Sequence, residues 1–298
     1  MYDSTKPYKE EILRLVRKTQ KPNYLPHSST DGIGTKGLYH WQERTFAYAV
    51  LDSLAMNLND LAVMRAKPVE LHDHIILPRE DNDAICEIVG TLVSECQKRN
   101  ITIDSGETSI HENFPGLEIS MTINGKISQN KPNKFFQGDY LIGIESSGLH
   151  SNGFTKIREL FGNESRREFV EPTLIYSDSL FKIMENFDIH GMAHITGGAY
   201  TRLKDFLGNS DIEICRHGLK PQKIYEEIKR KGKLTDEEMY RTFNCGVGFI
   251  LSVPKHSIEK IASELSHNEF KSDLIGRVTG GDGKIKIDSA FSGKQIVF

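Results

Sequence analysis

Residues 30–36, with the sequence TDGIGTK, bring a carboxylate, two glycines and a lysine into one short segment. The glycines let the backbone turn tightly and bring its N–H groups close to a ligand. The carboxylate of Asp31 could hold Mg²⁺, and the ammonium group of Lys36 could contact a phosphate. The segment is not a P-loop sequence, and alone it also fits an ordinary polar glycine turn.

Further carboxylates could complete such a site. Asp52, Asn59 and Asp60 are seven and eight residues apart in a stretch with helical periodicity, so they share one helix face. Glu107 follows a short apolar stretch, where a strand would run into a loop. Asp31, Asp60 and Glu107 could then share a metal ion, since Mg²⁺ prefers oxygen ligands. The plainer interpretations are a polar helix face turned to water and an ordinary turn glutamate.

The second half contains another polar segment, residues 146–153 with the sequence SSGLHSNG. It lies between a predicted strand and a predicted helix, and N–H groups at a helix start favour anions. His150 and Asn152 add hydrogen-bonding and proton-transfer capacity. The alternative is a Ser/Asn helix cap with an incidental histidine.

Two glycine-dense loops, at 194–198 and 239–248, could also approach a ligand closely. Neither names a reaction by itself. Cys245 lies in the second loop, but no histidine or aspartate partner can be inferred for it. We therefore expect Cys245 to be a small packed residue rather than a nucleophile.

Periodicity predicts the elements that would position these residues. The predicted helices cover 8–18, 45–65, 82–98, 153–161, 175–187, 200–208 and 256–267. The predicted strands cover 69–77, 101–107, 117–125, 139–147 and 247–254, and the third of these is expected to end at an Asn-Gly turn. A polar segment with Pro and Gly at 128–138 suggests a boundary between domains 1–130 and 131–298. Strands mixed with helices in both halves predict an α+β fold.

Composition restricts the class of protein. The chain has 298 residues, 38% of them hydrophobic and 27% charged, with a net charge of −3 and no basic tail. Nucleic acid is therefore a poor candidate partner. No apolar run reaches the ~18–20 residues that a membrane span needs, and no secretion signal is visible. The four cysteines form no metal-binding spacing. We expect a cytoplasmic protein.

Taken in order, six segments resemble the successive motifs of the AIR synthetase (phosphoribosylformylglycinamidine cyclo-ligase) family. They are TDGIGTK, NDLAVMRAKP, GETS, SSGLHSNGF, AHITGGA and EMYRTFNCGVG. The resemblance extends from about residue 29 to about residue 280, and LHSNGF and MYRTFNCGVG are its most discriminating parts.

The resemblance implies a fold of two domains. The N-terminal mixed sheets of two subunits would pair into a barrel-like core of a homodimer, and a C-terminal α/β domain would complete an ATP cleft. The implied reaction converts formylglycinamidine ribonucleotide (FGAM) and ATP to aminoimidazole ribonucleotide (AIR), ADP and phosphate.

The resemblance also implies roles for individual residues. His150, Asn152 and His194 would serve catalysis. ATP would be bound by Lys36, Thr35, Asp60, Ser151 and Asn59. Mg²⁺ would be held by Asp31, Asp60 and Glu107.

Several positions depart from the family pattern. Arg65 replaces the glycine of the Asp-x4-Gly-Ala-x-Pro signature, Ser105 stands where a glycine is common, and Ala199 ends what is often a triple-glycine run. The family's N-terminal glycine-rich loop is not visible before Thr30. That region instead carries Lys6, Lys9, Arg14, Arg17, Lys18 and Lys21. These basic side chains could take over part of the substrate-phosphate binding, or could simply face water.

These departures leave two alternatives open. One is a related ATP-dependent kinase or synthetase that acts on another small substrate. The other is a non-catalytic homologue that only binds a nucleotide.

Overall fold

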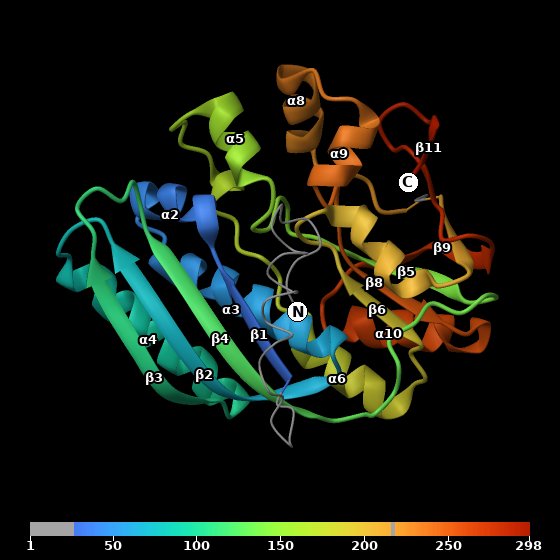
Figure 1. The fold of residues 1–298 in the computed structure, drawn as a ribbon, viewed down its shortest axis with the longest axis horizontal. Helices are drawn as coiled ribbons and strands as arrows, with labels where there is room; N and C mark the ends of the chain where they lie inside the picture. Colours follow the sequence, from blue (N-terminus) through green and yellow to red (C-terminus); the bar gives the residue numbers. More distant parts are fainter. Residues whose placement is uncertain (1–26, 216–217) are drawn as a thin grey trace, which may run out of the picture.

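The computed structural model describes residues 27–215 and 218–298, which form two β-sheets flanked by helices (Figure 1). The predicted α+β class is confirmed. The helix expected at 8–18 and the basic N-terminal segment lie outside the described residues.

The first sheet has four strands in the order β1-β4-β2-β3. Neighbouring strands are antiparallel except for β2 and β3, which are parallel. The strands are β1 (His27–Gly32), β2 (Ala66–Leu77), β3 (Thr102–Ile110) and β4 (Glu118–Ile127). The helices of this half are η1 (Gly34–Lys36), α2 (Gly37–Glu43), α3 (Phe46–Val63) and α4 (Asn82–Arg99).

Helices α3 and α4 cover one face of this sheet. Leu54, Leu58 and Leu61 recur at helical spacing on α3, and they pack with alternate residues of β4 such as Ile119 and Ile123. No described helix covers the other face (Figure 1), and no closed barrel forms within the described part of the chain.

The second sheet has seven strands in the order β11-β10-β7-β9-β5-β8-β6. Its pairs are antiparallel except for β7 and β10. The strands are β5 (Tyr140–Glu145), β6 (Gly191–His194), β7 (Ser210–Ile214), β8 (Val247–Val253), β9 (Ser272–Gly280), β10 (Ile285–Asp288) and β11 (Gln295–Val297).

Helices cover both faces of the second sheet, which explains why every residue of β8 is buried. The helices are α5 (Phe154–Phe161), α6 (Ser177–Asn186), α7 (Lys204–Leu207), α8 (Lys223–Gly232), α9 (Asp236–Thr242) and α10 (Ile258–His267). The short 3-10 turns are η2 (Arg167–Phe169), η3 (Ala199–Leu203) and η4 (Lys255–Ser257). The sequence analysis did not predict α2, α8, α9, β1, β6, β7 or β9–β11.

Two local predictions were wrong. The Asn-Gly pair at 124–125 is not a turn, because β4 continues through it to Ile127. A Cβ at Gly125 would lie only 3.1 Å from a methyl of Leu61, so this glycine lets α3 approach the sheet closely. Glu107 is not in a loop either, because β3 stays paired with β2 as far as Ile110.

Candidate functional site

The polar face of α3 is buried, because α3 packs on the first sheet with one side and meets α6 and β6 of the second half with the other. Asp52 and Asn59 are 0% exposed. The interpretation of this face as one turned to water was therefore wrong. Its polar groups must be satisfied by protein partners or by a ligand.

Asp52 joins the two halves of the chain. Its Oδ2 lies 2.7 Å from Lys36 Nζ and 2.8 Å from His40 Nε2, both in the first half. Its Oδ1 accepts hydrogen bonds from Ser151 Oγ at 2.9 Å and from the backbone N–H of Thr173 at 2.8 Å. The sequence analysis missed His40 and Thr173 as members of this cluster.

The charges of this cluster depend on one another. Burial alone would raise the pKa of the Asp52 carboxyl, but the adjacent Lys36 ammonium and His40 ring hold it well below its usual range. Burial lowers the pKa of Lys36 in spite of Asp52. Lys36 Nζ also donates to the carbonyl oxygen of Glu171 at 2.6 Å. The ammonium group therefore already has acceptors within the protein, on the Asp52 carboxylate and on the Glu171 carbonyl.

The Asn59 side chain accepts hydrogen bonds at the N-terminus of α6 and also contacts His194. Its Oδ1 accepts from the backbone N–H groups of Tyr176 and Ser177, at 2.8 and 3.2 Å. These bonds fix which end of the amide is NH₂, and that group lies 3.3 Å from His194 Nε2. Nε2 must therefore accept, so the proton of the ring lies on Nδ1.

The Asp60 carboxylate accepts the hydrogen bond that His194 Nδ1–H donates. His194 Nδ1 lies 3.1 Å from Asp60 Oδ1, and the Asp60 side chain is 29% exposed while that of His194 is 1% exposed. Through Asp60, the buried His194 ring is thus connected to solvent. A carboxylate that holds a histidine in one tautomer is a common arrangement in proton-transfer sites.

The His150 ring is buried and has no hydrogen-bond partner in the part of the chain that the structure describes. Both ring nitrogens, and the Asn152 Nδ2 two residues later, are fully enclosed and unpaired among the described residues. Burial, aided by the nearby His194 ring and Lys36 ammonium, lowers the pKa of His150 well below its ordinary value. Unpaired buried polar atoms are costly and rare, and they favour a ligand or reacting group at this position.

The backbone around His150 is held in an uncommon conformation. Its φ of 56° is left-handed, a region that costs most residues free energy. Asn244 holds the preceding turn, because its Nδ2 donates to Gly148 O at 2.8 Å while its Oδ1 accepts from Ser146 Oγ at 2.9 Å. The Tyr225 hydroxyl also donates to Gly148 O, at 2.7 Å. The FNCG segment thus supports the loop that carries His150.

Thr35 and Cys245 complete the predicted residues of this region. Thr35 Oγ1 lies 3.4 Å from Thr155 Oγ1, across the junction of the two halves. Cys245 is 0% exposed and packs in the core of the second half, as expected. Glu118 was not predicted, yet its Oε1 accepts the N–H of Gly34, 3.3 Å away, within the predicted phosphate-binding segment.

Asp31 and Glu107, two of the three carboxylates predicted to hold a metal, do not meet within one chain. Residues that lie opposite one another on neighbouring strands form rows across the sheet. The row of Asp31 continues through Met121 and Asp73 to Gly106. Glu107 lies in the adjacent row, with His74 and Ser120. Adjacent rows point to opposite faces, and three strand spacings separate the two edges by about 14 Å. Asp60 lies on α3, with its Oδ1 3.1 Å from His194 Nδ1.

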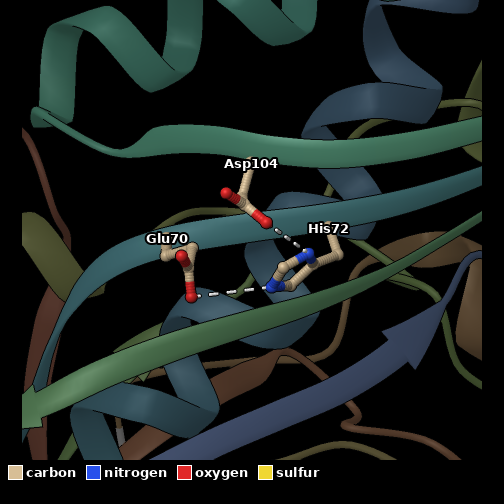
Figure 2. Close-up of side chains that lie close together, drawn as sticks. All are labelled: Glu70, His72 and Asp104. Carbon is tan, nitrogen blue, oxygen red and sulfur yellow. Dashed lines mark ion pairs between the residues drawn. The ribbon is translucent and has the colours of Figure 1, made fainter.

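A different group lies on the uncovered face of the first sheet (Figure 2). Glu70, His72 and Asp104 offer ligand atoms within 4.8 Å of one another. His72 Nε2 lies 3.6 Å from Glu70 and Nδ1 lies 3.7 Å from Asp104, while Nδ1 is also hydrogen-bonded to Ser105 Oγ at 2.8 Å. Since one metal ion binds only one nitrogen of a ring, this arrangement fits an imidazole held between two carboxylates better than a metal centre.

Two family models match the chain. The model of the N-terminal domain of AIR synthase related protein matches residues 20–127, and that of the C-terminal domain matches residues 137–288. A curated relative, the phosphoribosylformylglycinamidine cyclo-ligase of Saccharolobus solfataricus, is 34% identical over 262 residues. The match covers 85% of this chain and 79% of that protein.

Solved structures share the fold. The hydrogenase maturation protein HypE, solved in complex with HypF, has a TM-score of 0.71 and 15% identity, and the match covers 98% of this chain and 99% of HypE. A HypE in complex with ATP has a TM-score of 0.63 and 16% identity, with 99% and 95% covered. At these identities the likeness concerns the fold alone.

Proposed function

This chain belongs to the AIR synthase related family, and from that premise we propose that it closes the imidazole ring of AIR from FGAM with consumption of ATP. The observation that carries the proposal is the set of unpaired, buried polar atoms of His150 and Asn152 beside the Asp52 cluster. These atoms come from the SSGLHSNG segment, which the family resemblance assigned to the reacting groups.

The reaction needs an activated amide. In the first step the γ-phosphoryl group of ATP is transferred to the formyl oxygen of FGAM, which releases ADP. A nitrogen of the amidine then attacks the formyl carbon, the carbon–oxygen bond breaks, and phosphate leaves with that oxygen. Phosphate is a far better leaving group than the amide oxygen, and catalysis rests on positioning and on stabilising the transferred charge.

The residues of the site fit these demands. His150, uncharged through burial, keeps an unprotonated ring nitrogen that can accept the proton that the attacking nitrogen loses. Asn152 Nδ2, which has no partner among the described residues, can donate to the developing charge on the substrate oxygen. His194, with its proton on Nδ1 toward Asp60 and its Nε2 accepting from Asn59, is held in one orientation beside these groups.

ATP remains part of the proposal, supported by the family and by the shared fold with the ATP complex of HypE. The predicted set of Asp31, Asp60 and Glu107 does not assemble around one Mg²⁺ within this chain, so no step is assigned to a metal held by all three. Mg²⁺ usually binds one or two carboxylates together with substrate phosphates. The role of each carboxylate singly stays a prediction, as do the division into domains 1–130 and 131–298 and the cytoplasmic location.

Purified protein tests the proposal. FGAM and ATP should yield AIR and ADP in equal amounts. Asp60→Asn should lower kcat/KM by about 100-fold, because the amide keeps the size of the side chain but not its charge. Its thermal stability should change little, and Asp282→Asn, an exposed control, should change neither. ADP release that ignores FGAM but responds to another metabolite would instead favour a related kinase.

A further inference from the structure

A groove outlined by cationic side chains lies between the two halves, apart from the residues of the candidate site. It has a volume of about 720 Å³ and is formed by the start of β2, the end of β4, the end of α4 and the first turns of α6. We call it the basic groove. Its cationic residues are Lys67, Lys98, Arg99, Lys126 and Lys182. Volumes of about 300–1,000 Å³ are typical of sites for small ligands.

The charge of the basic groove is only partly compensated. Three of the five cations already have carboxylate partners: Lys67 pairs with Glu185, Lys98 with Glu95, and Arg99 with Glu95 and Asp178. Lys126 and Lys182 have no carboxylate within ion-pair distance among the described residues. Lys126 also stands directly opposite Lys67 on the neighbouring strand. Glu185, 2.8 Å from Lys67, already offsets the charge of Lys67, so Lys126 and Lys182 are the two cations of the groove that a bound anion would pair with.

The floor of the basic groove is apolar. Val69 and Ile127 line it and are 44% and 43% exposed, two of the most exposed large hydrophobic residues described. Phe181 adds a half-buried aromatic ring from α6. A ligand that covers this floor gains hydrophobic free energy, while its anionic part reaches the lysines at the rim.

The basic groove is also connected to the candidate site. Ser128, which lines the groove, donates its hydroxyl to Arg65 O at 2.8 Å, and Arg65 holds carbonyls of the second half. The other wall is α6, whose first backbone N–H groups, of Tyr176 and Ser177, donate hydrogen bonds to Asn59 Oδ1. A ligand that bridges the walls would therefore act on the junction where His194 and Asp60 lie.

We propose that the basic groove binds a nucleoside phosphate, with its base on the apolar floor and its phosphate between Lys126 and Lys182. This inference goes beyond the proposed function and does not depend on it. The site would be regulatory, because its walls come from both halves and it contains none of the residues proposed to act on FGAM.

A reporter in the groove tests this binding. In the full chain carrying Phe181→Trp, AMP should change the added fluorescence saturably. Adenosine alone and inorganic phosphate alone should each bind at least about tenfold more weakly. Adding Lys126→Ala with Lys182→Ala should weaken AMP about tenfold, because two charge-assisted contacts are lost. Both lysines are exposed, so circular dichroism should show an unchanged fold.

The matched control is Lys255→Ala with Lys260→Ala, which removes the same charge from exposed positions near α10. It should leave the AMP affinity within about twofold. Equal weakening by both double variants would show charge attraction without a site and overturn the proposal. So would phosphate binding as tightly as AMP, or a reporter that does not respond to AMP. None of these readouts involves FGAM, so failure of the proposed cyclisation would not affect them.

Discussion

Asp52 accepts hydrogen bonds or ion pairs from both halves of the chain. Among the described residues, its charge is the only negative one in direct contact with the buried Lys36 ammonium. Asp52→Asn would leave that ammonium buried without its counter-charge. We expect the free energy of unfolding to fall by about 3 kcal/mol. Urea denaturation of Asp52→Asn beside the exposed control Asp282→Asn measures this. Equal unfolding midpoints would contradict the role of Asp52 as the charge that joins the halves.

His150 gives the protein a specific sensitivity to acid. Its pKa is lowered in the folded state, so below its ordinary value of about 6.5 the unfolded chain binds a proton that the folded chain does not. Stability must then fall as the pH falls, by up to about 1.4 kcal/mol per pH unit for this group.

His150→Gln should remove that part of the acid sensitivity. Between pH 6.5 and pH 5.5 the variant should lose about 1 kcal/mol less stability than the unchanged protein. Chemical denaturation at the two pH values gives the difference. The exposed His267→Gln serves as the control and should show no such gain. Identical pH dependence in all three proteins would show that the His150 ring is not held uncharged by the fold.

At the scale of elements, long periodic segments were predictable and the turns were not. The leucine spacing of α3 and the apolar run of β8 identified both elements, because burial on one or both faces imposes a pattern on the sequence. Asn124-Gly125 carried a turn signal, but its glycine serves the close approach of α3. Nothing local distinguishes these two uses of glycine.

The site was predictable in part for the same reason. His150, Ser151 and Asn152 were found because they form a compact polar segment between a strand and a helix. His40 and Thr173 were missed, since their partner Asp52 lies 12 and 121 residues away. Contacts of that kind are set by how α3 sits between the two sheets, and no single-sequence pattern records it.

Arg65, just after the C-terminus of α3, is a position where this chain departs from the family pattern. It follows α3 with a left-handed φ of 56°, which explains a glycine at this place in the family signature. The arginine is 1% exposed, and its Nη2 donates to Ile189 O at 2.7 Å and His190 O at 3.3 Å. Arg65 therefore adopts a less favourable backbone conformation than glycine would, and in return its side chain makes hydrogen bonds between the two halves.

Replacing Arg65 tests that exchange. Arg65→Met should cost about 3 kcal/mol of stability, because two carbonyls lose their donor inside the protein. Arg65→Gly should cost about 1 kcal/mol less, because glycine relieves the left-handed φ. Arg44→Met is a matched control, with a φ of 57° and a 44% exposed side chain, and should cost below about 1 kcal/mol. A small loss in Arg65→Met, measured by thermal unfolding, would contradict the role of Arg65 between the halves.

At the scale of the whole molecule, the uncovered face of the first sheet suggests a partner. Its two edge strands, β1 and β3, are free to pair among the described residues, and edges of this kind are usually covered. We propose a homodimer in which this face meets its copy. The face is polar, with the hydroxyls of Thr30 and Thr122 2.9 Å apart across β1 and β4.

Light scattering at micromolar protein should give the mass of two chains. Thr122→Arg, near the middle of this face, should shift the mass toward one chain, because a second copy would meet a buried unpaired charge. Ser263→Arg, on the exposed side of α10, should leave the mass unchanged. A monomeric mass for the unchanged protein would rule out the dimer.

The central claim is that the formyl oxygen of FGAM leaves as phosphate. Turnover of FGAM labelled with ¹⁸O at the formyl group, followed by mass spectrometry of the phosphate, measures this directly. The account predicts one labelled oxygen in each phosphate released and one AIR formed for each ADP. His150→Gln should slow the appearance of the label by at least about 100-fold. Phosphate without label, or ADP release with no AIR, would contradict the account.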